Sequence, residues 1–220
     1  MTLFRDREQA GEILAGRLPS IEAGSVVLAI PNGGVLVGAA LARELKLPFY
    51  PLVIRKIQLP WNTESGFGAV ASDGSVLYNQ SLLPRLGLSR EEIEAQTEQA
   101  RASVRERMKT YGVEGGLPAL GGKTVILTDD GLASGITMEA ALQVASRKNP
   151  RKIIVAVPTA SRSAAARIKT LADDFVCPDI RGGRVFAVAD AYAHWRDVED
   201  DEVKAALSGR GAKTERWSKE

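Results

Sequence analysis

The stretch Val125–Thr137, VILTDDGLASGIT, is the most informative part of the chain. It begins with a continuous run of apolar and β-branched residues, passes through two adjacent aspartates, Asp129 and Asp130, and ends in a loop of small residues. A continuous apolar run of this kind predicts a strand buried on both faces, as in parallel sheets covered by helices. The glycine at position 135 and the residues after it predict a loop that leads into a helix.

Similar strand and helix patterns alternate on both sides of this stretch. Alternation of this kind predicts an α/β fold, a doubly wound parallel sheet flanked by helices. The expected strands are residues 25–30, 49–54, 124–128, 151–158 and 175–176, and the expected helices are one capped by Asp6 and running to residue 18, 35–45, 137–148, 161–171 and 202–207.

The segment between the second and third of these strands is longer than a simple crossover. Residues 57–68 contain prolines and glycines typical of a loop, and Asp73-Gly74 predicts a hairpin turn between 68–71 and 75–78. Ser89 and Glu92 form a capping-box pattern at the start of a long charged helix over 89–111. A narrow stripe along that helix can dock on the sheet or on a second subunit; its members are Ile93, Thr97, Ala100, Val104 and Met108.

Composition and charge favour one ordinary globular domain over residues 1–207, with a polar tail over 208–220 that we expect to be disordered. Hydrophobic residues make up 45% of the 220 positions, and the net charge of +2 gives no reason to propose nucleic acid as a partner. The single cysteine, Cys177, and single histidine, His194, exclude an internal disulfide and a cysteine- or histidine-rich metal site. We expect Cys177 to be structural and His194 to be a packing or surface residue.

No apolar run approaches the 18 residues needed for a membrane-spanning helix. The first residues turn charged at once, at Arg5, Asp6 and Arg7, so the start of the chain lacks the apolar region of a secretory signal. These two features lead us to expect a cytoplasmic protein.

The residues that follow the expected strands suggest a ligand, because ligands of such sheets bind beyond the carboxyl ends of the strands. Asp129 and Asp130 are acceptors suited to hydroxyl groups or a cation, and the turn over 133–137 offers backbone N–H groups, hydroxyls and a helix N-terminus suited to phosphate. A ribose 5-phosphate needs acceptors for its hydroxyl groups and donors for its phosphate. The alternative is a solvated turn, although two adjacent carboxylates repel unless something compensates. A P-loop is excluded, because Leu117 stands where its first glycine belongs.

On these residues, segment 125–137 resembles the phosphoribosyl pyrophosphate (PRPP) binding motif of the type I phosphoribosyltransferases. It follows the motif's order of apolar strand, acidic pair, short loop and Ser/Thr-Gly-x-Ser/Thr, and it departs at Gly131, where the wider motif prefers an apolar residue. The opening Phe4–Gly11 and the pattern over Ala191–Val198 resemble an uncharacterised bacterial and archaeal subgroup of that family.

The resemblance implies a type I phosphoribosyltransferase fold that transfers ribose 5-phosphate from PRPP to a nitrogenous base, with release of pyrophosphate and with Mg²⁺ carried mainly on PRPP oxygens. Asp129 and Asp130 are then catalytic and hold the ribose hydroxyls, together with Lys56 near the pyrophosphate. The 5-phosphate is held by Ala133, Ser134, Gly135, Ile136 and Thr137.

Pyrophosphate binding is implied for the loop after the first strand and for the basic pair after the second, namely Asn32, Gly33, Gly34, Arg55 and Lys56. Relatives often carry a basic residue where this chain has Asn32, which puts pyrophosphate affinity in question. The family also implies a strained or cis peptide bond beside Asn32, and a flexible loop over PRPP at residues 57–68. Within that loop we expect Trp61 and Phe67 to pack against the protein.

The acceptor base is not identified by the sequence. The resemblance implies a hood over 178–196 that recognises it, in which Tyr192 or Trp195 can stack on a ring or pack the hood onto the sheet. It also implies a homodimer and no membrane partner. The alternative is a regulatory or binding protein on the same fold, which senses PRPP or nucleotides without turnover.

Overall fold

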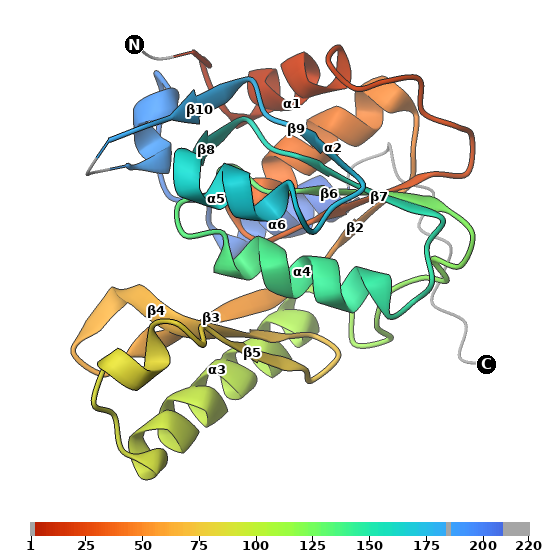
Figure 1. Ribbon diagram of the computed structural model, residues 1–220. Coiled ribbons are helices and arrows are strands. Elements are labelled where there is room, and N and C mark those ends of the chain that lie inside the picture. The colour runs from red at the N-terminus through yellow and green to blue at the C-terminus, as the bar shows by residue number, and fades with distance from the viewer. Residues whose placement is uncertain (1–2, 184–185, 209–220) are drawn as a thin grey trace.

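A five-stranded parallel sheet forms the centre of the protein (Figure 1), in a computed structural model that describes residues 3–183 and 186–208. The strand order is β2–β1–β6–β7–β9, and every neighbouring pair is parallel. This confirms the predicted fold class. The strands are β1 Val26–Ala29, β2 Phe49–Pro51, β6 Thr124–Thr128, β7 Lys152–Ala156 and β9 Asp174–Val176.

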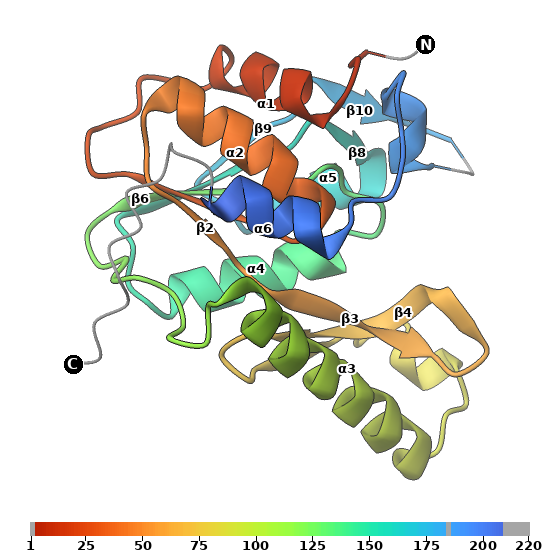
Figure 2. The same cartoon turned by 180° about the vertical axis from the view of Figure 1, so that it is seen from behind.

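Helices cover both faces of this sheet. One face carries α1 (Arg7–Ala15), α2 (Gly33–Leu45) and α6 (Asp200–Ser208), which lie together in Figure 2, and the other carries α4 (Ile136–Ser146) and α5 (Arg162–Ile168). Alternate residues of each strand enter the two layers: Val27 and Ile126 pack with α2, whereas Leu28 and Val125 pack with α4. Burial on both sides explains why these strands are continuously apolar rather than alternating.

A second, antiparallel sheet lies where the sequence predicted a loop followed by a hairpin. Its strands are β3 (Ile54–Leu59), β4 (Asn62–Ala71) and β5 (Val76–Tyr78), followed by the short helix η1 (Leu83–Arg85). The expected strand over 49–54 is confirmed only over Phe49–Pro51, because the parallel ladder stops at Pro51 and Ile54 begins a strand of a different sheet. The hairpin around Asp73-Gly74 is confirmed.

The predicted loop over 57–68 is also wrong, because most of it is paired strand. Its glycines serve close packing: a Cβ on Gly66 would lie 2.3 Å from Lys56 Cγ, and one on Gly68 would lie 2.6 Å from the Leu77 carbonyl oxygen. Phe67 is fully buried, as expected. Trp61, at the turn between β3 and β4, is 62% exposed, so the expectation that it packs is wrong.

The long helix α3 (Arg90–Tyr111) docks within the chain. It begins with the predicted capping box of Ser89 and Glu92 and ends at Gly112, whose φ of 67° is left-handed. Its buried stripe packs on β3 and β4, and its C-terminal end reaches α6. The stripe covers the three-stranded sheet, not the central one, and α4 packs on the opposite face of that small sheet.

The C-terminal part contains more regular structure than predicted. A short strand β8 (Thr159–Ser161) pairs in parallel with β10 (Asp179–Arg181), and the short helix η2 (Val188–Ala191) follows. Ser208 belongs to α6 instead of the predicted tail, and residues 209–220 of that tail lie outside the described residues. Among the helices that the structure describes, none combines the length and the apolar character needed to cross a membrane.

Candidate functional site

The pairing of β1 with β6 brings two of the predicted binding segments together. Ile30 N–H donates to the Thr128 carbonyl at 3.0 Å, which aligns the ends of the two strands. A Cβ on Gly33 would lie 1.8 Å from Asp130 Oδ2, and one on Gly34 would lie 2.8 Å from Asp129 Cα. The loop over 31–34 therefore packs directly on the acidic pair, and only glycine fits at these two positions.

The loop that precedes α2 has an unusual backbone. The Pro31–Asn32 peptide bond is cis, as the resemblance implied. Helix α2 begins at Gly33, immediately after this bond. Because the first N–H groups of a helix have no partner within it, this end of α2 offers donors beside the carboxylates.

The acidic pair is buried, and Asp130 is paired with a cation, Arg7. Arg7 Nε donates to Asp130 Oδ2 at 2.9 Å, and the Tyr192 hydroxyl donates to the Asp130 carbonyl at 2.6 Å. Burial and the neighbouring Asp130 charge raise the pKa of Asp129 well above its usual value. Burial also raises the pKa of Asp130, against the opposing effect of Arg7.

The predicted phosphate loop leads into α4, as the sequence indicated. Gly135 has a φ of 74°, so a side chain there would be strained, and helix α4 starts at Ile136. The Ser161 hydroxyl donates to the Ala133 carbonyl at 2.7 Å, and Arg167 donates to the Ser134 carbonyl. These contacts hold the loop through its carbonyl oxygens. The first N–H groups of α4 have no partners within the helix, because they lie at its start.

A neighbouring side chain, that of Val188, occupies the space beside Gly131, where the family motif prefers an apolar residue. A Cβ on Gly131 would lie 2.6 Å from Val188 Cγ1 and 2.9 Å from Thr159 Cγ2. Val188 thus fills the space next to the position where the family prefers an apolar residue. Leu132, the next residue, exchanges backbone hydrogen bonds with Thr159 and Ser161 of β8, so the loop is also held at its backbone.

The Asn32 side chain is fully engaged by other parts of the protein. Its Nδ2 donates to the Val198 carbonyl at 2.8 Å and to Asp200 Oδ1 at 3.0 Å, and its Oδ1 accepts from Arg107 and from the Tyr111 hydroxyl. Arg107 also pairs with Asp200 at 2.9 Å. Burial and the Asp200 contact raise the pKa of Tyr111 to about 12, so its hydroxyl remains a donor at neutral pH.

Arg55 and Lys56 lie on opposite faces of β3, since adjacent strand residues alternate. Arg55 lies near Arg107 and the Asn32 contacts, and burial together with the Arg107 charge lowers its pKa. No carboxylate of the described residues lies within ion-pair distance of Arg55. The Lys56 side chain lies against Gly66, on the other face of the strand. Arg55 is therefore the member of the predicted basic pair that adjoins the cis-peptide loop.

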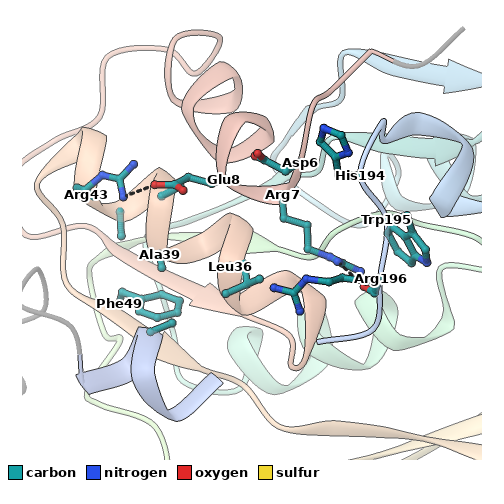
Figure 3. Close-up of a pocket in the computed structure, with 13 residues that line it drawn as sticks. Asp6, Arg7, Glu8, Leu36, Ala39, Arg43, Phe49, His194, Trp195 and Arg196 are labelled. Carbon is teal, nitrogen blue, oxygen red and sulfur yellow. Dashed lines mark hydrogen bonds and ion pairs between the residues drawn. The ribbon is translucent and has the colours of Figure 1, made fainter. Parts of the chain in front are cut away.

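A groove of about 760 Å³ lies beside this site, between α1, α2 and α6 (Figure 3). Leu36, Ala39 and Phe49 supply apolar lining, and Trp195 stands at one end. Asp129 and Asp130 do not line the groove. Arg7 lines it and at the same time pairs with Asp130, so one side chain links the groove to the acidic pair.

Two further predictions on side chains have clear outcomes. Tyr192 is 3% exposed and packs on Phe4 and Trp195, which confirms the packing interpretation over ring stacking on a ligand. Cys177 is half-buried, with its thiol near the Asp179 carbonyl at 3.3 Å, and burial raises its pKa to about 12, as suits a structural cysteine.

Sequence reasoning missed the residues that reach the site from distant segments. Arg107, on the long charged helix, is 22% exposed and its side chain bonds inside the protein. Its spacing of four residues from Tyr111 was an available signal, because such residues share a helix face. Arg7 lies in the segment Phe4–Gly11 that resembles a subgroup of the family, but the sequence assigned it no function. Nothing local marks Asp200, which is distinguished only by its tertiary contacts.

A doubly wound sheet with an acidic pair at the end of a central strand and a phosphate-type loop after it defines the type I phosphoribosyltransferase class. The family model for the phosphoribosyl transferase domain matches residues 17–191, and the chain belongs to this family. A candidate phosphoribosyl transferase from two Mycobacterium tuberculosis strains is 34% identical over 208 residues, which is 94% of this chain. The chain spans about half the length of those curated relatives, 47%.

Among solved structures, the protein TT1426 from Thermus thermophilus is similar throughout. It is 35% identical, with a TM-score of 0.76, and the match covers 94% of this chain and 98% of that one. This agreement supports the fold described above over nearly its full length.

Proposed function

We propose that the protein transfers ribose 5-phosphate from PRPP to a nitrogenous base and releases pyrophosphate. The observation that carries this proposal is the direct packing of Gly33 and Gly34 on Asp129 and Asp130. This packing juxtaposes helix N–H donors with carboxylate acceptors, while a second set of helix N–H donors, at the start of α4, follows a few residues later along the chain. PRPP needs acceptors for its hydroxyls and donors for two phosphate groups.

In the proposed reaction, the bond between ribose C1 and the pyrophosphate oxygen breaks, and the oxygen keeps the electron pair. A bond from a base nitrogen to C1 forms, and the proton on that nitrogen passes to water. Asp129 and Asp130 hold the ribose hydroxyls and favour the positive charge that develops on the ring. Ala133–Thr137 hold the 5-phosphate. The protein then acts by positioning and by electrostatic stabilisation, without a covalent intermediate.

The departing pyrophosphate is proposed to lie against Asn32, Gly33 and Gly34, with Arg55 as the nearest cation. Lys56 is also proposed to contact the pyrophosphate, although its side chain lies on the other face of β3. Because the Asn32 side chain is engaged by Arg107 and Tyr111, backbone N–H groups and Arg55 are the groups available to meet the anion.

Mg²⁺ is proposed to enter on PRPP oxygens. Among the described residues no group of three or more histidine, cysteine or acidic side chains could hold a metal ion, and Asp130 already pairs with Arg7. Mg²⁺ commonly binds through substrate phosphates and waters, so these residues fit that arrangement. When bound, the ion supplies charge neutralisation at the pyrophosphate. We also propose a cytoplasmic location and a homodimer, as in the family.

The engaged state of Asn32 favours one alternative, a protein that senses PRPP or nucleotides without turnover. A neutral side chain with all its polar atoms satisfied contributes little to stabilising a departing pyrophosphate.

Calorimetric titration with PRPP and Mg²⁺, followed by a pyrophosphate-release assay across a panel of purine and pyrimidine bases, tests both functions. We expect micromolar binding and release with at least one base. Binding without release from any base would favour the sensing protein, and no binding by the folded protein would overturn both.

Arg107→Met is predicted to weaken PRPP binding about tenfold. The substitution removes donors from Asn32 and Asp200, and a hydrogen bond to a charged group contributes about 1.5–3 kcal/mol. The loop carrying the cis peptide then loses a support from α3. Arg105→Met is the matched control, because Arg105 lies on the same helix, is exposed and, among the described residues, pairs with the exposed Glu98. Equal affinity of the two variants in the calorimetric titration would contradict this role for Arg107.

A further inference from the structure

The Arg7 guanidinium makes an unusual set of contacts for a residue at the start of a helix. Its side chain is only 7% exposed. Nε donates to Asp130 Oδ2 at 2.9 Å, and one terminal nitrogen donates to the Arg196 carbonyl at 2.9 Å. The guanidinium also lies over the Trp195 ring, 3.9 Å from its centroid (Figure 3). Two directional bonds and an aromatic face therefore fix this cation in place.

The segments on either side of Arg7 are fixed as well. Asp6 caps α1 by accepting from Gln9 N–H at 2.8 Å. The chain before it is bonded to residues 191–194 through backbone hydrogen bonds such as Ala193 N–H to the Phe4 carbonyl at 2.8 Å. Tyr192, in that second segment, donates to the Asp130 carbonyl. The N-terminal segment thus holds Asp130 by its side chain, and the segment over 191–194 holds it by its backbone.

The two aspartates therefore differ in the charged groups that lie next to their carboxylates. Within the described structure, Asp130 has a cation at ion-pair distance and Asp129 has none. Asp129 Oδ1 accepts from the Asp130 backbone N–H at 2.8 Å, and the two carboxyl groups interact with each other. When two neighbouring buried carboxylates share one proton, it goes to the member without a cation.

We propose that Arg7 is a positioning residue that keeps Asp130 ionised and oriented, so that Asp130 is the principal acceptor for the ribose hydroxyls and Asp129 carries the proton that the pair shares. This assignment rests on the proposed function, since it names the roles of the two acids within the PRPP site. It gives a function to the N-terminal helix, which begins before the matched family domain at residue 17.

The electrostatics of the free protein agree with this assignment. The titratable or charged groups that face Asp130 are Asp129, Arg7 and the phenol of Tyr192. Burial raises the pKa of both aspartates, but Arg7 opposes this rise at Asp130, whereas burial and the Asp130 charge raise the pKa of Asp129 well above its usual value. Burial and the Asp130 charge raise the pKa of Tyr192, which therefore stays a neutral donor.

The test compares Arg7→Met with Arg7→Lys and with Arg43→Met. Arg43 is the matched control, because it lines the same groove and its ion pairs within the described part of the chain are with the exposed glutamates Glu8, Glu12 and Glu44. The first readout is the carboxyl ¹³C titration of aspartate-labelled protein without any ligand. We expect Arg7→Met to move the Asp130 midpoint up by about one pH unit or more, and Arg7→Lys to retain most of the wild-type value.

The second readout is PRPP binding as a function of pH. If ionised Asp130 accepts the hydroxyls, binding is lost as the pH falls through its pKa, and the midpoint of that loss shifts upward in Arg7→Met. At neutral pH we expect at least tenfold weaker binding in Arg7→Met and unchanged binding in Arg43→Met. Weaker binding with no shift in either midpoint would mean that Arg7 acts only through packing, and would overturn the proposal.

A further variant separates a loss of folding in Arg7→Met from a loss of the ion pair. The double variant Arg7→Met with Asp130→Asn has no unpaired buried carboxylate at position 130, so we expect it to regain most of the thermal stability that Arg7→Met loses. A double variant as unstable as the single one would also overturn the proposal. If wild type fails to bind PRPP while the ¹³C midpoint still shifts in Arg7→Met, the ion pair stands and the proposed function fails.

Discussion

The double substitution Asp129→Asn with Asp130→Asn is expected to weaken PRPP binding at least 100-fold, a loss of about 2.7 kcal/mol or more. Hydrogen bonds to an ionised acceptor are roughly twice as strong as those between neutral groups. An asparagine presents one neutral acceptor oxygen, and its amide donors face hydroxyls that need acceptors. Calorimetric titration with PRPP and Mg²⁺ measures the loss directly.

The fold is expected to survive this change. Two effects oppose each other: the repulsion within the acidic pair disappears, and Arg7 loses a charged partner while keeping an amide oxygen as acceptor. We expect a net loss of about 2 kcal/mol at most in the free energy of unfolding, or about 4–8 °C in thermal midpoint for a chain of this length.

A second adjacent pair, Asp173 and Asp174, supplies the control. Asp173 accepts from the Ile153 N–H, and Asp174 pairs with Lys152, at the opposite end of the sheet from the candidate site. Replacing both by asparagine likewise exchanges two adjacent carboxyl groups for amides. PRPP affinity equal to wild type in this control, with loss in the Asp129 and Asp130 variant, assigns the effect to the site. Equal loss in both would reduce it to a general charge effect.

The central sheet and the position of the site could be predicted because their signals are local. A strand buried on both faces is continuously apolar, so β1, β6 and β7 are recognisable from sequence alone. Segment 125–137 carries its strand, acids and loop within thirteen positions. The cis bond at Asn32 followed from the family resemblance and from no property of the residues themselves.

The inserted sheet could not be predicted in the same way. Gly66 and Gly68 are typical of loops in sequence, although each is required by a close cross-strand contact that exists only after folding. Arg107 and Asp200 are distant in sequence from Asn32, at separations of 75 and 168 residues, and no local pattern records such contacts. Their effect on the site is known only from the tertiary structure.

These distant contacts change how the Asn32 loop is understood. The sequence alone raised the question of a missing basic residue at position 32. In the structure, Arg107 donates to the Asn32 side chain and Arg55 lies close to the same cluster. Around the Asn32 side chain, two guanidinium groups and one carboxylate, Asp200, lie close together. The inserted sheet and helix thus bring positive charge to position 32, whereas the two glycines that follow it pack on the acidic pair.

Gly33→Ala is expected to abolish PRPP binding, with an effect as large as that of the acidic-pair substitution. The new Cβ would lie 1.8 Å from Asp130 Oδ2 and 2.8 Å from Arg7 Nε. The Asp130 carboxylate cannot swing away cheaply, because Arg7 holds its side chain and Tyr192 holds its carbonyl. Either the carboxylate or the start of α2 must move, and both belong to the proposed binding surface.

The stability of Gly33→Ala is expected to fall by about 1–3 kcal/mol, the usual cost of overpacking a filled space. Gly121→Ala is the matched control, because Gly121 has an ordinary φ and its added Cβ would meet only the Lys148 carbonyl oxygen at 3.9 Å. Thermal unfolding and PRPP titration of both variants give the comparison. Wild-type affinity in Gly33→Ala would show that the loop and the acidic pair separate when ligand binds, and that their close packing is not the geometry that holds PRPP.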